Sequence, residues 1–195
     1  MRPILILLLC FFSLASFSQN QTEQQRMAKL KATMTYPVIK GTERSGVYPV
    51  KDFTETTDIN MEYKLLFDLT DFNPDSVNTE SNIGLNEIAH KINLHVAAGI
   101  PLKNIHIIII VHGPALKAIT NNEYYQAHFK MDNPSMKLVN DLAAAGAKFI
   151  ACGQAMANQG IERANLLPVI GVAFTAQTSL SYYQMKGYIK FDAKR

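Results

Sequence analysis

Two residues that commonly perform chemistry stand at the ends of strongly apolar stretches of the sequence. His112 comes directly after the β-branched run 105–111, and Cys152 comes directly after the apolar run 147–151. Both runs predict strands buried in a parallel sheet. Because ligands of open α/β sheets bind outside the carboxyl ends of the strands, Cys152 and His112 are candidate catalytic residues.

Each of these two residues also has a structural interpretation. A helix predicted to begin after Cys152 and to end at Gly160 would favour a thiolate through its free N–H groups and its dipole. Cysteine is also often a buried, inert packing residue. His112 would hydrogen-bond the thiolate or a bound ligand, or else it would cap backbone groups of its loop. The sequence leaves both alternatives open.

Small residues follow both candidates. Gly113 and Gly153 would let the backbone turn tightly and leave space beside the reactive side chain. Together with Gln154 they are the predicted ligand-binding positions. His106 precedes His112 by six positions, which is too far along a strand for a shared metal. No His or Cys spacing favours a metal site, and no motif indicates a cofactor, so we expect neither.

Strands and helices alternate along the part of the chain that carries these residues. An apolar stripe of helical spacing runs through residues 82–98, and Asn133 with Pro134 is typical of the start of another helix. Strands are predicted over 63–69, 105–111, 147–151, 168–173 and 188–191, and further helices over 153–160 and 176–186. This alternation predicts a three-layer α/β/α sandwich with a mostly parallel five-stranded sheet, whose strand order the pattern does not determine.

Length and composition are those of one globular domain. The chain has 195 residues, of which 48% are hydrophobic and 18% charged, so disorder of the whole chain is excluded. The formal net charge of +3 is small and dispersed. We therefore expect no nucleic-acid partner.

The first residues have the pattern of a secretory signal peptide. Arg2 precedes a nine-residue apolar run, and Ser16 and Ser18 stand at the spacing that a signal peptidase recognises. The run is too short for a membrane anchor. We expect cleavage after Ser18 and a periplasmic or secreted chain with no membrane attachment. Its one remaining thiol, Cys152, would form no internal disulfide.

The rest of the chain divides by composition into two parts. Residues 19–60 are predicted to form a polar leader and an N-terminal arm, and residues 61–195 are predicted to form the α/β domain.

Four short segments resemble the DsrE/DsrF-like family, in an exported form. They are Val111–Ala115 (VHGPA), Asn133-Pro134 with its helix to Gly146, Cys152–Gln154 (CGQ), and Lys186–Tyr188 (KGY). The resemblance implies an α/β sandwich that forms trimers or hexamers. Some members pass persulfide sulfur on a cysteine, in sulfur oxidation or tRNA thiolation, and that cysteine falls on Cys152. An exported chain would not meet cytoplasmic tRNA.

Three functions remain open at this point. The first is a thiol-based sulfur (persulfide) carrier or binding protein that uses Cys152, with a sulfur donor or acceptor as partner. The second is a non-catalytic, oligomeric module that binds a small molecule. The third is a small sulfur transferase, so the sequence does not decide whether the protein is an enzyme. Ile83 and Leu94, opposite the apolar stripe of their helix, add to the expectation of a homo-oligomer.

Overall fold

The centre of the fold is a parallel sheet of five strands in the order β4-β3-β2-β1-β5. The computed structural model describes residues 22–73 and 79–193. The strands are β1 (Tyr63–Leu69), β2 (Ile105–Val111), β3 (Ala147–Cys152), β4 (Ile170–Ala173) and β5 (Ile189–Asp192). The predicted fold class is confirmed, and β3 extends one residue further than predicted, so that Cys152 is its last residue.

Helices connect successive strands. The α-helices are α2 (Ile83–Ala97), α3 (Asn122–Phe129), α4 (Met136–Ala144), α5 (Gly153–Gln159) and α6 (Ala176–Met185). Short 3₁₀ helices are η1 (Glu43–Ser45), η3 (Leu102–Asn104), η4 (Gly113–Ile119) and η5 (Arg163–Asn165). Residues 22–32 are also helical.

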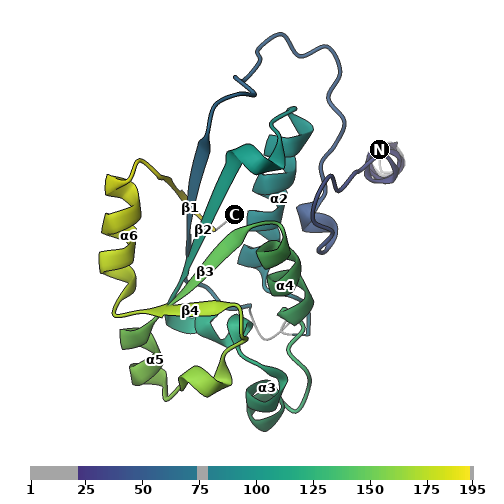
Figure 1. Ribbon diagram of the computed structural model, residues 1–195. Helices are drawn as coiled ribbons and strands as arrows, with labels where there is room; N and C mark the ends of the chain where they lie inside the picture. The colour runs from purple at the N-terminus through teal and green to yellow at the C-terminus, as the bar shows by residue number, and fades with distance from the viewer. Residues whose placement is uncertain (1–21, 74–78, 194–195) are drawn as a thin grey trace, which may run out of the picture. The chain divides into compact units, whose positions relative to one another are not determined.

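The helices of the domain lie on both faces of the sheet. α2 and α4 cover one face, and α6 covers the other (Figure 1). From β1 to β4 each new strand adds to the same edge, whereas β5 returns to the free edge of β1. Right-handed crossovers place the helix of a returning connection on the opposite face, which explains why α6 stands apart from α2 and α4.

Helix α2 follows its sequence signals closely. The Asn82 side chain accepts a hydrogen bond from the Leu85 amide at 3.1 Å and so caps the first turn. Gly99, at φ +95°, takes the left-handed conformation that ends the helix. The apolar stripe of α2 is buried against the sheet.

Helix α4 begins later than predicted. Its first residue is Met136, and Ser135 is the residue before it rather than Asn133. The Asn133 side chain accepts from the Ser135 amide at 2.8 Å and donates to the carbonyls of Ala118 and Thr120. Asn133 therefore fixes the loop that leads into α4, because its amide satisfies backbone groups of two neighbouring segments.

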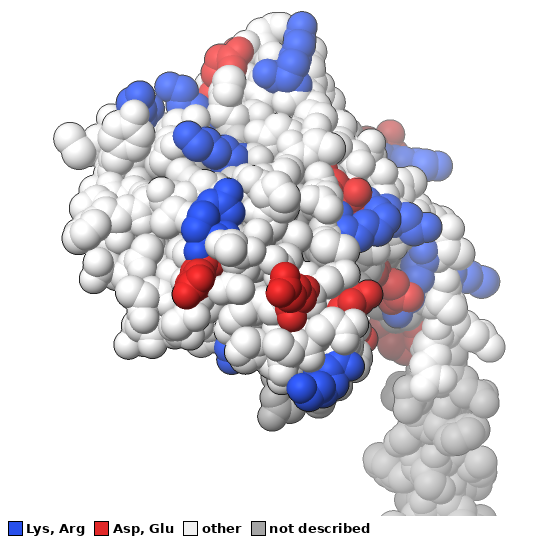
Figure 2. All heavy atoms as spheres, turned by 60° about the horizontal axis from the view of Figure 1, so that its bottom comes forward, with Lys and Arg blue, Asp and Glu red and all other residues white. Residues whose placement is uncertain are grey.

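The described residues form two compact units, residues 22–35 with 48–52, and residues 36–47 with 53–73 and 79–193. The predicted signal peptide, 1–18, lies outside the described residues. Within the described ranges, no helix is both long and apolar enough to cross a bilayer. Acidic and basic side chains are interspersed over the face at the carboxyl ends of the strands (Figure 2).

Candidate functional site

Three polar side chains share one face of the sheet near the carboxyl ends of neighbouring strands. They are Asp68 on β1, His112 just after β2, and Cys152 at the end of β3. Two positions before each of them, the strand carries an apolar residue that packs beneath α6. These apolar residues are Leu66, Ile110 and Ile150. Since side chains two apart along a strand point the same way, all three polar residues face the α6 side.

The strand register makes His112 and Cys152 neighbours. The last paired positions of β2 and β3 are Val111 and Ala151, so His112 and Cys152 are the next positions along. The His112 amide donates to the Leu69 carbonyl at 3.0 Å, which keeps His112 in line with the sheet. Adjacent strands lie about 4.8 Å apart, so His112 and Cys152 occupy neighbouring backbone positions on one face of the sheet.

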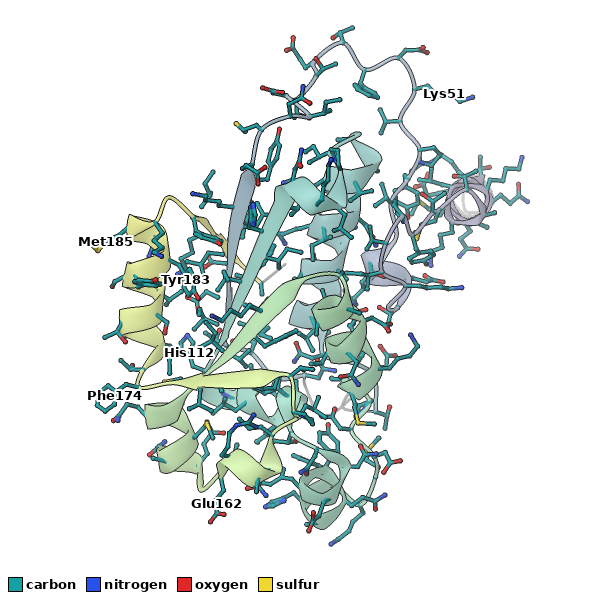
Figure 3. The ribbon with its side chains drawn as sticks, in the orientation of Figure 1. Lys51, His112, Glu162, Phe174, Tyr183 and Met185 are labelled. Atoms are coloured by element: carbon teal, nitrogen blue, oxygen red, sulfur yellow. The ribbon has the colours of Figure 1, made fainter. Side chains whose placement is uncertain are left out.

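His112 is anchored on its other side by Asp68. Its Nε2 lies 2.8 Å from Asp68 Oδ1, and Lys190 Nζ on β5 lies 2.8 Å from Asp68 Oδ2. The hydrogen bond from His112 lowers the pKa of the Asp68 carboxyl; burial partly opposes this, and Lys190 lowers the pKa further. Asp68 is therefore a carboxylate at neutral pH. His112 is partly open to solvent at this end of the sheet (Figure 3).

Cys152 is buried beside the start of α6. The residue is 5% exposed, and its Sγ lies 3.9 Å from Oγ1 of Thr175. Thr175 is the N-cap of α6, and its hydroxyl accepts from the Gln177 amide at 3.3 Å. The dipole of α6 therefore favours negative charge near the sulfur. Cys152 also precedes α5, as predicted, so two helices begin near the thiol.

The other predicted site residues shape the backbone around the thiol. Gly113 has φ +58°, a conformation that favours glycine. A Cβ on Gly153 would lie 2.9 Å from the Ala173 carbonyl oxygen, so α5 meets the end of β4 only because residue 153 is glycine. The Gln154 amide donates to the Phe174 carbonyl at 3.1 Å, and Gln154 is exposed. Ligand binding at these three positions stays a prediction.

Sequence reasoning missed Asp68 and Lys190. A signal for Asp68 was available, because it is an acidic residue within the apolar stretch of β1. A charge in a buried strand is costly unless it is paired. Its partners could not be named, because they come from β2 and β5, whose places beside β1 depend on the strand order.

The remaining histidines lie away from this row. His106 contacts Glu62 at the amino end of β2, and His128 stacks on Tyr124 in α3. The described ranges contain no group of three or more His, Cys, Asp and Glu side chains arranged to hold a metal ion.

A separate surface hollow lies at the amino ends of β2 and β3. Its volume is about 520 Å³, and its lining includes Lys103, His106, Lys148 and Tyr188. Because Cys152 stands at the opposite end of β3, this hollow and the group formed by Asp68, His112 and Cys152 are different sites.

No curated protein matches the chain, whereas solved structures of similar fold exist. MTH1491 of Methanobacterium thermoautotrophicum, a protein of unknown function, is 15% identical with a TM-score of 0.46; the match covers 67% of this chain and 98% of that one. The ychN protein of E. coli is 14% identical with a TM-score of 0.47, covering 66% and 96%. The model of the DsrE/DsrF-like family matches residues 76–191, more than half of the sequence, and the chain therefore belongs to the DsrE/DsrF-like family.

Proposed function

We propose that the protein carries sulfane sulfur as a persulfide on Cys152. The observation that supports this function is the juxtaposition of Cys152 and His112, on adjacent strands and on the same face of the sheet. A thiol needs a base nearby to become the nucleophile, and an imidazole is a suitable base at neutral pH. The family to which the chain belongs includes sulfur-relay proteins, which supports the same function.

The transfer step balances without an oxidant. The Cys152 thiolate attacks the terminal sulfur of a donor persulfide, R–S–SH. The donor S–S bond breaks, its electron pair stays on the sulfur of R, and a new S–S bond forms on Cys152. His112 takes the proton of the Cys152 thiol and returns it to the departing thiolate, so that R–SH leaves. Delivery to an acceptor thiol is the reverse exchange.

Access to the sulfur involves the turn between β4 and α6. Cys152 is buried, and Thr175 of this turn contacts its sulfur. Phe174, the preceding residue, is 78% exposed and points away from the sheet (Figure 3). Sulfur loading therefore requires this turn to move aside, because a donor cannot reach a thiol that is 5% exposed.

Intact mass measurement tests the carrier function. The wild-type protein is incubated with inorganic polysulfide, freed of excess reagent and weighed before and after treatment with a reducing agent. We expect a mass increase of one sulfur atom that reduction removes, none in Cys152→Ser, and slower loading in His112→Ala. A wild-type mass that does not change would refute the proposal.

Export and self-association belong to the same proposal. The signal-like segment 1–18 supports a carrier that works in the periplasm or after secretion. N-terminal sequencing of the exported protein should begin at or near Gln19, and a chain that retains Met1 would contradict export. The family resemblance supports assembly into trimers or hexamers. The small, dispersed net charge of +3 supports the absence of a nucleic-acid partner.

One observation favours a second candidate, the non-catalytic binding module. In the hollow at the amino ends of the strands, Lys103 and Lys148 form no salt bridge with any described residue. Its ligand would be a small anion with an apolar part. Such binding would persist in Cys152→Ser, whereas sulfur carriage would not. Repeated turnover of a sulfur donor would instead indicate the small sulfur transferase.

A further inference from the structure

We propose that Asp68 is the positioning residue of the thiol site, and that Lys190 tunes it. In this inference Asp68 holds His112 in the tautomer whose Nδ1 is the proton acceptor for Cys152. The inference rests on the proposed pairing of Cys152 with His112, but it does not depend on sulfur being the cargo.

The order of the strands places the imidazole between a carboxylate and a thiol. Asp68 lies on β1, His112 follows the neighbouring strand β2, and Cys152 ends β3 on the far side of β2. A carboxylate only accepts hydrogen bonds, so the 2.8 Å contact with Asp68 requires that Nε2 of His112 carries a hydrogen. In a neutral ring the lone pair then sits on Nδ1.

Nδ1 is available for this task. Among the hydrogen bonds of the described residues, none involves Nδ1 of His112, whereas Nδ1 of both His95 and His128 is engaged by a backbone carbonyl. When Nδ1 takes the thiol proton, an imidazolium forms between the Asp68 carboxylate and the new Cys152 thiolate. Both negative charges stabilise it.

Lys190 opposes part of that stabilisation. Its ammonium group lies 2.8 Å from the second oxygen of Asp68, which fixes the rotation of the carboxylate. It also brings a positive charge near the imidazole, which disfavours the imidazolium. On this side of the sheet, Asp192 on β5 lies 3.6 Å from Lys190, and Tyr183 and Tyr188 pack against the cluster beneath α6. The same face carries Lys64, His106 and Lys148 nearer the amino ends of the strands. Asp68 and Lys190 should therefore act on His112 with opposite signs.

The first test is the pH profile of Cys152 alkylation by iodoacetamide. The alkylation rate at neutral pH is divided by the rate at high pH, where the Cys152 thiol is fully ionised in every variant. This ratio removes differences in how easily the reagent reaches the sulfur. We expect this ratio to fall roughly tenfold in Asp68→Asn and to rise roughly threefold in Lys190→Met. Lys190→Arg, which keeps the charge, should match the wild type.

The second test reads the tautomer by nitrogen NMR of the His112 ring. The wild type should show hydrogen on Nε2. Asp68→Asn should show more hydrogen on Nδ1, because an amide can donate to Nε2. A residue that only stabilises the fold would not change this signal.

Unchanged profiles and an unchanged tautomer in Asp68→Asn would overturn the inference. If that variant does not fold, a ratio in Lys190→Met that equals or falls below the wild-type ratio would overturn it. Failure of sulfur loading in the wild type would refute the carrier function alone, because alkylation and NMR report on the thiol and the ring without any sulfur donor.

Discussion

At the scale of single residues, Gly153 links the fold to the thiol next to it. Its missing side chain lets the start of α5 approach the end of β4, with the Ala173 and Phe174 carbonyls nearby. This contact holds β3, which ends in Cys152, against the turn that covers the sulfur. The residue after Cys152 is therefore constrained by packing, and ligand contact is not needed to explain a glycine there.

Gly153→Ala is expected to destabilise the fold by about 1–3 kcal/mol, because the new Cβ would lie too close to backbone that cannot easily move. Urea unfolding measures the loss. Gly171→Ala is the matched control on β4, since its Cβ would meet the nearest atom, the Phe149 carbonyl oxygen, at 3.4 Å. Equal stabilities of the two variants would contradict the role assigned to Gly153.

Asp68 should also make stability depend on acidity. Its folded-state pKa lies below the ordinary value of 3.8, first because of the His112 hydrogen bond and then because of Lys190. The contribution of the ionised Asp68 carboxyl to the stability of the fold is fully present at pH values above the ordinary pKa. It is lost as the pH falls through the lowered pKa of the folded state. The stability gap between wild type and Asp68→Asn should thus be wide at about pH 6 and narrow at about pH 2. Asp192→Asn, at an exposed position, is the control. A difference in stability between the wild type and Asp68→Asn that does not narrow at low pH would contradict the prediction.

At the scale of elements, the sequence predicts best where one local pattern decides. β1 and β2 have the predicted bounds, because a run of apolar residues is a direct sign of a buried strand. The contact between Asp68 and His112 was not predictable in this way. Two side chains 44 positions apart meet there because β1 and β2 pair in one register. Neither run encodes which strand becomes its neighbour.

Helix α2 also holds the N-terminal arm, residues 36–47, through two buried amides. Asn93 accepts from the amides of Val38 and Ile39, and donates to the carbonyls of Ile39 and Ser45 at 2.8 Å. Asn86 binds the arm at Thr42. Residues 36–47, which lie within the predicted leader and arm of residues 19–60, therefore pack against α2.

Replacing Asn93 should release this arm. Asn93→Ala leaves buried backbone groups of Ile39 and its neighbours without partners, at a cost of about 3 kcal/mol. Hydrogen exchange should become faster over residues 36–47, while β2 and β3 stay protected. Leu94→Ala, at the adjacent exposed position, should change neither the stability of the fold nor the hydrogen exchange over residues 36–47. Uniformly faster exchange throughout the domain would show that Asn93 supports the whole fold and not the arm in particular.

At the scale of the whole domain, the returning connection places α6 on the face of the sheet opposite α2 and α4. Its outer side carries Tyr182 and Met185, which is 89% exposed, and Phe174 precedes it. Figure 3 shows Met185 pointing away from the sheet, and Figure 2 shows few charges on the α6 side. Leu94 on α2, one of the residues that first favoured self-association, is 43% exposed. The outer side of α6 is thus the stronger candidate for contact between copies.

Self-association should accordingly depend on α6 more than on α2. Light scattering of the chain without residues 1–18 should show a trimer or hexamer at micromolar concentration, since exposed apolar side chains gathered on one helix favour contact with a partner. Met185→Lys should shift the mass toward that of a monomer, because it would bury a charge in the contact. Leu94→Lys is the matched control on the opposite face and should leave the mass unchanged. A monomeric wild type would contradict the assembly, and dissociation by Leu94→Lys alone would move the contact to α2.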